Sequence, residues 1–267
     1  MTVAGSVGVI GLALVDGALV ALPKADALKT LSLRRSPAWA ALLPGSIVVG
    51  TFVPVAFPRA ALALIVLAGV ATPLLAGVSV FAVARGPRPA LIAVALGLGL
   101  AAGLISGWAG ELSATLLTAL GCLAVGIVLV RLIPRRWVLL GTLGMCLADV
   151  ALLASGVGQT AATLMSAATA NLPGPLFAQA SVGPVSTDYP DLVLAAVLGG
   201  VLASRHQQRI GALLVTAVAI VYGLLLPAGG ILPATVPTAV TLVGLECAGL
   251  MAGRRLQAVA TVADAAP

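Results

Sequence analysis

Charged residues are scarce in this chain, and their scarcity indicates the solvent in which it folds. Of 267 residues, 8% are charged and 61% are hydrophobic, whereas soluble domains carry about 25% charged residues. The 14 basic residues stand singly or in small groups between apolar runs, a pattern that argues against nucleic acid as a partner. The composition therefore predicts a protein whose partner is the lipid bilayer.

Residues that build metal centres and histidine-dependent active sites are also few. The chain has one histidine, His206, which we expect to be solvated in a cytoplasmic turn. We therefore predict neither a histidine-dependent triad nor a multi-histidine metal site. The three cysteines lie in apolar runs without a CxxC spacing, as small core residues do: Cys122, Cys146 and Cys247. We expect neither a metal nor a cofactor.

Long apolar runs bounded by charge, proline or glycine recur along the whole sequence. About 20 apolar residues cross the hydrocarbon core as a helix, and nine runs approach or exceed that length. They predict an all-α bundle of nine transmembrane helices at residues 3–22, 38–57, 60–84, 89–109, 112–132, 137–157, 189–204, 210–227 and 231–252. Of the two long connections, 23–37 is basic, while 158–188 is uncharged before Asp188 and is expected to fold against the membrane.

The distribution of basic residues over the connections predicts the orientation. Of the 14 Lys and Arg residues, only Arg59 falls on one of the two sides that nine alternating helices define. Basic residues concentrate on the cytoplasmic side. We expect a multi-pass protein of the cell membrane with its N-terminus outside and its C-terminus in the cytoplasm.

Three glycines recur every four residues in the fourth apolar run, at Gly99, Gly103 and Gly107. This spacing places small residues on one helix face and lets a neighbouring helix approach closely. The same run matches a loose G-x-G-x-x-A pattern at 97–102, but a dinucleotide-binding loop must follow a strand, and none is expected there. We predict a packing role for these glycines.

Four acidic residues fall inside predicted spans: Asp16, Asp149, Asp191 and Glu246. An ionisable group at that depth is expensive unless it is neutral, paired or hydrated, and so marks a candidate functional site. Asp149 lies about 12 Å from the outer end of its helix, and Asp191 begins the next helix just after Pro190, so both belong to the outer half. Asp16 and Glu246 belong to the inner half, where they are candidates for a hydrogen-bonded pair.

The ninth run opens with two prolines four residues apart, at Pro233 and Pro237. They leave backbone groups without helical partners, and such backbone is tolerated at membrane depth only against protein or a wet cavity. The outer ends of the sixth, seventh and ninth helices are therefore expected to enclose a polar cavity. Two aspartates facing one cavity can share a proton, so that one activates a water and the other protonates a carbonyl. In the alternative interpretation, Asp149 hydrogen-bonds a neighbouring helix and Asp191 is an ordinary helix N-terminal residue.

The order of these features resembles the presenilin and signal peptide peptidase family of intramembrane aspartyl proteases. That family has nine spans, with Tyr-Asp in the sixth, Gly-x-Gly-Asp in the seventh and Pro-Ala-Leu opening the ninth. The similarity covers residues 137–252, including the loop stretch LMSAATANLPGPLF, and before that extends to little more than the span count. The corresponding residues here are Ala148-Asp149, Asp188-Tyr189-Pro190-Asp191 and Pro233-Ala234-Thr235.

The resemblance implies a protease that hydrolyses peptide bonds within transmembrane peptide substrates, with Asp149 and Asp191 as the catalytic pair. It also implies a five-helix scaffold at 1–136, a catalytic region at 137–256 that includes the 158–188 loop, and a mobile tail at 257–267. The expected orientation is similar to that of signal peptide peptidase, so substrates are expected to have their N-termini inside. By the same resemblance, the substrate-binding residues are Pro233, Ala234, Thr235 and Pro190.

Three other interpretations stay open. The chain departs from the family motifs at Ala148, Asp188, Pro190 and Thr235, which leaves room for a catalytically inactive relative. Membrane carboxylates at staggered depths beside proline-broken helices are also typical of a proton-coupled small-molecule transporter. A prepilin-type aspartyl peptidase fits less well, because no lysine follows Asp191.

Overall fold

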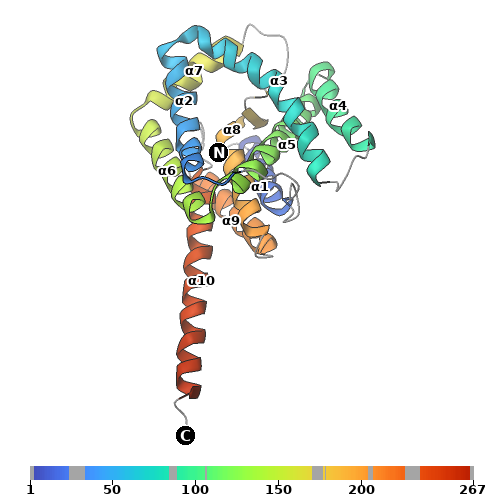
Figure 1. Cartoon of the computed structure of the whole chain (residues 1–267). Helices are drawn as coiled ribbons and strands as arrows, with labels where there is room; N and C mark the ends of the chain where they lie inside the picture. Colours follow the sequence, from blue (N-terminus) through green and yellow to red (C-terminus); the bar gives the residue numbers. More distant parts are fainter. Residues whose placement is uncertain are drawn as a thin grey trace.

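The computed structural model describes residues 3–23, 34–83, 89–105, 107–169, 177, 179–203, 207–225 and 235–264. These residues form a bundle that is mostly helical, with one helix projecting from its base (Figure 1). Each of the nine predicted spans lies on a helix. These helices are α1 (Val3–Ala21), α2 (Leu42–Ala56, preceded by the 3-10 turn Pro37–Ala41), α3 (Pro58–Val83), α4 (Pro89–Leu104), α5 (Trp108–Leu132), α6 (Arg135–Ala154), α8 (Tyr189–Ala203), α9 (Gln208–Leu225) and α10 (Thr235–Asp264).

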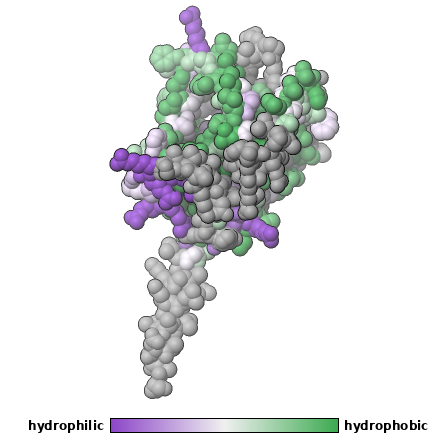
Figure 2. Space-filling view, turned by 45° about the vertical axis from the view of Figure 1, so that its right-hand side comes forward, coloured by the Kyte–Doolittle hydropathy of each residue, from purple (hydrophilic) through white to green (hydrophobic). Residues whose placement is uncertain are grey.

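Five helical stretches are long and apolar enough to cross a membrane: Pro37–Ala56, Pro58–Val80, Trp108–Leu132, Arg135–Ala154 and Gln208–Leu225. The other four predicted spans correspond to shorter apolar helices, at Gly5–Ala21, Ala93–Leu104, Tyr189–Ala203 and Thr235–Gly249. Large apolar side chains cover much of the surface visible in Figure 2, and side chains such as Leu74 and Leu213 are 68% and 72% exposed. Apolar surface of this extent marks a membrane protein. The count of nine crossings stays a prediction.

Two helices, α5 and α8, form the centre of the bundle. Helix α8 packs against α1, α2, α5, α9 and α10, and its side chains are buried along almost its whole length. Its 15 residues rise about 22 Å, less than the roughly 30 Å of the hydrocarbon core. Helix α8 is therefore too short to cross the hydrocarbon core by itself, and protein surrounds almost all of it.

Close helix contacts in the centre depend on glycines other than those predicted. A Cβ atom at Gly199 of α8 would lie 2.6 Å from the carbonyl oxygen of Val20 on α1. By contrast, a Cβ atom at Gly103 of α4 would meet nothing within 4 Å, and Gly107 lies outside the helix with a φ of 86°. A Cβ atom at Gly99 would meet only Leu117 Cδ2 of α5, at the ordinary contact distance of 3.9 Å. The predicted close approach of a neighbouring helix to these glycines is therefore wrong.

The segment 158–188 contains structure that the sequence analysis did not predict. Helix α7 (Val157–Thr169) is followed by an antiparallel hairpin of β1 (Gln179–Val182) and β2 (Val185–Asp188). The turn between the strands has Gly183 in the left-handed region, at φ 62°, where glycine has no steric cost. The all-α prediction thus needs one addition, a two-stranded sheet.

The hairpin is held inside the bundle by a threonine of α5. The Thr115 hydroxyl donates to the carbonyl oxygen of Ser181 at 2.8 Å and accepts from the Ser181 amide at 3.1 Å. On the opposite side, Gly8 of α1 lets the helix approach the Val182 carbonyl directly. The hairpin therefore packs between α1 and α5 and continues without a linker into α8.

Helix α10 leaves the bundle and continues to Asp264 (Figure 1). The segment 257–267, predicted to be a mobile tail, is thus helical as far as Asp264, and its mobility stays a prediction. The predicted division into a scaffold at 1–136 and a catalytic region at 137–256 also stays a prediction. Helices from both regions pack on one another, as α5 does on α8.

Candidate active site

Asp149 lies on α6, half-buried, opposite the first residue of α10. Its Oδ2 accepts a hydrogen bond of 2.5 Å from the hydroxyl of Thr235, a side chain with 0% exposure. Short hydrogen bonds to carboxylates are among the stronger polar contacts in proteins. Thr235, predicted to bind substrate, is therefore also the residue that fixes the orientation of the Asp149 carboxyl group.

Asp191 lies in the first turn of α8 and is 5% exposed. Its Oδ2 accepts a hydrogen bond of 3.2 Å from the hydroxyl of Thr187 on β2. A carboxylate in the first turn of a helix also interacts favourably with the helix dipole. The direct passage from β2 into α8 thus fixes Asp191 against the hairpin.

The two aspartates belong to one cluster of carboxyl groups. The carboxyl groups of Asp188, Asp149 and Asp16 are all close enough to Asp191 to interact with it electrostatically. The thiol of Cys146, one turn before Asp149 on α6, interacts with both Asp149 and Asp191. Crowded carboxyl groups cannot all ionise at low free-energy cost, so such a cluster favours shared protons.

Asp188 is a member of the cluster that the sequence analysis placed in a loop. Gln179, its partner across the hairpin, donates from Nε2 to Asp188 Oδ1 at 3.2 Å. Desolvation raises the pKa of the Asp188 carboxyl; the Gln179 hydrogen bond acts in the opposite direction, and the nearby Asp149 charge raises the pKa further. The sequence feature that could have indicated this place for Asp188 is its three-residue spacing from Asp191 at the start of an apolar run.

The other residues predicted for the site lie outside the carboxyl cluster or outside the described residues. Pro190 is the second residue of α8 and half-buried, while Pro233 and Ala234 lie outside the described residues. Glu246 forms an ion pair with Arg135 of α6, with Nη2 and Oε1 2.5 Å apart. The suggested pair of Asp16 and Glu246 is therefore wrong.

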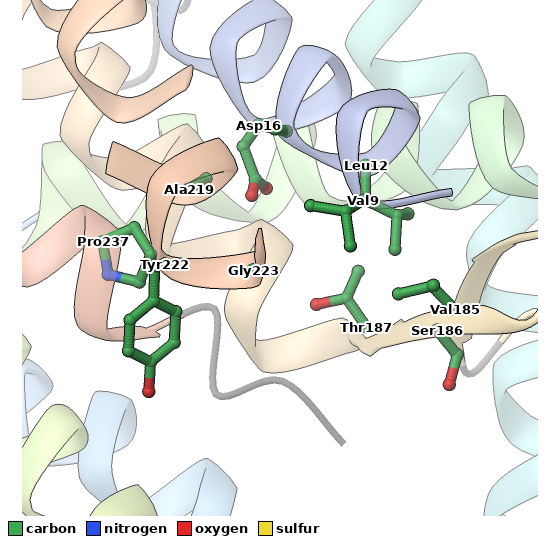
Figure 3. A pocket seen from close by; sticks show the side chains of 11 residues that line it. Val9, Leu12, Asp16, Val185, Ser186, Thr187, Ala219, Tyr222, Gly223 and Pro237 are labelled. Atoms are coloured by element: carbon green, nitrogen blue, oxygen red, sulfur yellow. The ribbon is translucent and has the colours of Figure 1, made fainter. Parts of the chain in front are cut away.

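A cavity of about 30 Å³ adjoins this cluster on the side of α1 (Figure 3). Its walls are mostly apolar and come from four elements rather than from α6 and α8. The polar side chains on it include Asp16, Thr187, which also bonds Asp191, and Tyr222, which interacts electrostatically with Asp149. The lining residues are Val9, Leu12, Ala13 and Asp16 of α1, Val185, Ser186 and Thr187 of β2, Ala219, Tyr222 and Gly223 of α9, and Pro237 of α10.

Two threonines of α10 offer a matched test of the bond to Asp149. Thr235→Val removes the hydroxyl that orients the carboxyl group. Under the protease prediction made from the sequence, kcat for peptide-bond cleavage should fall about tenfold, the value of one hydrogen bond to a charged group. Thr241→Val is the control, because the buried Thr241 hydroxyl has no hydrogen-bond partner among the described residues. Equal kinetics for the two variants, measured on a reconstituted substrate, would contradict a role for the Thr235–Asp149 bond.

The site described above combines Asp149 of α6, Asp191 of α8 and Thr235 of α10, three residues of the segments that carry the motif resemblance. The hairpin residues Thr187 and Asp188 complete the site, because the hairpin places both of them beside Asp191. Comparison with protein-family models, with curated proteins and with solved structures finds no match to this chain.

Proposed function

We propose that this protein is an intramembrane aspartyl protease that hydrolyses peptide bonds within transmembrane segments. The observation that supports it most is the meeting of two carboxyl groups from different helices, Asp149 and Asp191, within electrostatic reach of each other. Each carboxyl group also accepts a hydrogen bond from a threonine hydroxyl. The pair thus has the fixed orientation that acid–base catalysis requires.

In the proposed mechanism the two carboxyl groups share one proton. The ionised carboxylate takes a proton from a water whose oxygen attacks the substrate carbonyl carbon, while the protonated partner gives its proton to the carbonyl oxygen. The tetrahedral intermediate collapses when the C–N bond breaks: the amine nitrogen receives the proton that the first carboxylate took from the water, and a hydroxyl of the intermediate returns its proton to the second carboxylate, which restores the pair. Asp149 is half-buried and Asp191 is deeply buried, so substrate would reach the pair from the α6 side.

The proposed orientation has the N-terminus outside and the C-terminus in the cytoplasm. It is supported by the junction of α5 and α6, where Arg35 donates from Nε to the Arg131 carbonyl oxygen and Arg135 pairs with Glu246. Hydrophilic side chains gather at this end of the bundle in Figure 2, as basic residues do on the cytoplasmic side.

This orientation predicts which substrates are cut. Single-span model peptides reconstituted in liposomes are expected to be cleaved when their N-termini lie on the side of the protein's own C-terminus. Mass spectrometry of the products measures the cleavage for each orientation of the substrate. Cleavage confined to substrates of the opposite orientation would contradict the predicted substrate orientation but leave the protease proposal standing.

The direct test of the function is hydrolysis by the purified protein. We expect cleavage of a single-span peptide in liposomes that continues in the presence of a metal chelator. A peptide isostere with a hydroxyl group at the scissile position is expected to inhibit it, because such a group mimics the tetrahedral intermediate. Absence of cleavage across a panel of peptides of both orientations would contradict the proposal.

One observation favours a second candidate, a proton-coupled transporter. Asp16 is a third deeply buried carboxyl group, 4% exposed, and it faces a cavity. Proton-coupled transporters use such intramembrane carboxyl groups as relays. Uptake of a small molecule into liposomes along a proton gradient, abolished in Asp16→Asn, would favour this function over proteolysis.

A further inference from the structure

Asp16 occupies an unusual place on α1. Its side chain is 4% exposed, and its Oδ1 has no hydrogen-bond partner among the described residues. Figure 3 shows the carboxyl group directed into the cavity between α1, α9 and β2. A buried polar atom without a partner is rare in native proteins and calls for a specific explanation.

The cavity has the size and the polar groups to hold water. A water molecule needs about 10–15 Å³ of such space and two to four polar partners, and this cavity measures about 30 Å³. The Asp16 carboxyl and the Thr187 hydroxyl, both on its lining, supply partners from opposite walls. Purely apolar cavities stay dry, so these two groups are what makes occupation by water favourable.

Thr187 connects this cavity to the candidate active site. Its hydroxyl proton is donated to Asp191 Oδ2, which leaves the lone pairs of the same oxygen as acceptors on the cavity side. A water in the cavity can therefore donate to Thr187 Oγ1. The titratable groups that interact with Asp16 or share its cavity are Cys122 of α5, Asp191 of α8 and Tyr222 of α9.

We infer that Asp16 is a positioning residue, a neutral carboxylic acid linked to Asp191 by a cavity water and Thr187. The Asp16 proton is donated to the water, the water donates to Thr187 Oγ1, and Thr187 donates to Asp191 Oδ2. Every donor in this chain points towards Asp191, so the chain stabilises negative charge on Asp191 in the state of the pair in which Asp149 holds the shared proton. The kinetic part of this inference rests on the proposed protease function, while the protonation of Asp16 does not.

Infrared spectroscopy of the purified protein at neutral pH tests the chain without any need for activity. The C=O stretch of a protonated carboxylic acid is expected in the difference spectrum of wild type minus Asp16→Asn, in which the band of the proton shared by Asp149 and Asp191 is common to both proteins and cancels. Thr187→Val is expected to shift this band, because it removes the acceptor of the water. Thr216→Val is the control, since Thr216 donates to the Ala13 carbonyl oxygen between α1 and α9 without lining the cavity itself, and it is expected to leave the band in place.

Two results would overturn the inference. One is a wild-type minus Asp16→Asn spectrum that contains carboxylate bands in place of the carboxylic acid band. The other is an acid band that is identical in wild type and Thr187→Val. Both results are independent of whether any substrate is cut, so a failed protease proposal is distinguishable from a failed Asp16 assignment.

Kinetics test the link to Asp191. Asp16→Leu replaces the carboxyl group by an apolar side chain of similar size, and we expect kcat to fall about tenfold with KM unchanged and thermal stability maintained. Thr187→Val is expected to have a similar effect, and the double variant to be no slower than the slower single variant, because both break one chain. If Asp16→Leu fails to fold, Asp16→Ala, which also removes the donor to the water, replaces it in the cycle. Two results would contradict the hydrogen-bonded chain. One is a loss of kcat in the double variant that equals the product of the two single losses, and the other is a wild-type kcat in the Asp16 variant.

Discussion

Replacement of either Asp149 or Asp191 by Asn is expected to lower kcat for transmembrane-peptide cleavage by about 10²- to 10⁴-fold, the usual contribution of a general acid or base. Asn keeps the size of the side chain and the oxygen that accepts from Thr235 or Thr187, so the fold should survive. It removes the shared proton on which the proposed mechanism depends. The measurement is the initial rate of product formation by the purified variants in liposomes.

The control for this pair is Glu111→Gln, which also removes one carboxylate. Glu111 lies exposed in the first turn of α5, outside the carboxyl cluster, and its variant is expected to cleave at the wild-type rate. Retention of more than half of the wild-type rate by either Asn variant would rule out that aspartate as a catalytic residue. A loss confined to one variant would replace the pair by a single carboxylate and so reject the aspartyl-protease mechanism.

A large effect on stability is expected from Gly199→Ala in the centre of α8. The new Cβ atom would lie 2.6 Å from the Val20 carbonyl oxygen, 2.7 Å from that of Leu19 and 2.7 Å from the Val20 Cα atom. All three are backbone atoms of α1, so no side chain can rotate to make room. Overpacking of this kind destabilises by about 1–3 kcal/mol or more, and α1 must move away from α8. We expect a clear fall in the midpoint of thermal unfolding in detergent.

The matched control is Gly77→Ala on α3, where a Cβ atom would meet nothing within 4 Å. Alanine is the better helix former by roughly 0.8–1 kcal/mol, so this variant is expected to unfold at the same temperature as the wild type or slightly above it. Equal midpoints for the Gly199 and Gly77 variants would show that α1 and α8 are not in backbone contact. The same comparison distinguishes a steric effect from a general effect of helix propensity.

The helices were predictable from the sequence because apolar length is the signal that the membrane imposes on a chain. Each predicted run lies on a helix. The depth argument grouped Asp149 with Asp191, whose carboxyl groups are close enough to interact, but it placed Asp16 in the other half, although Asp16 also interacts with Asp191. The hairpin at 179–188 was missed because its strands have four residues each, too few for an alternating pattern to be distinguished from a loop.

Side-chain partners were the least predictable part of the site. Glu246 pairs with Arg135, 111 positions away in the sequence, and Thr235 reaches Asp149 across 86 positions. Glycine spacing likewise indicates which residues share a helix face but not whether another helix lies against that face. For this reason the spacing favoured Gly103, which has no close neighbour, whereas the close contact falls at Gly199.

The absence of any linker between β2 and α8 has a consequence for how this protein can change during evolution. A residue inserted after Asp188 would turn every later α8 side chain by about 100° around the helix axis, and Asp191 would then point away from Thr187. Insertions and deletions at this junction should therefore be selected against more strongly than substitutions at Tyr189 or Pro190. Among homologues, chain length between Thr187 and Asp191 should vary less than the identity of the residues in between.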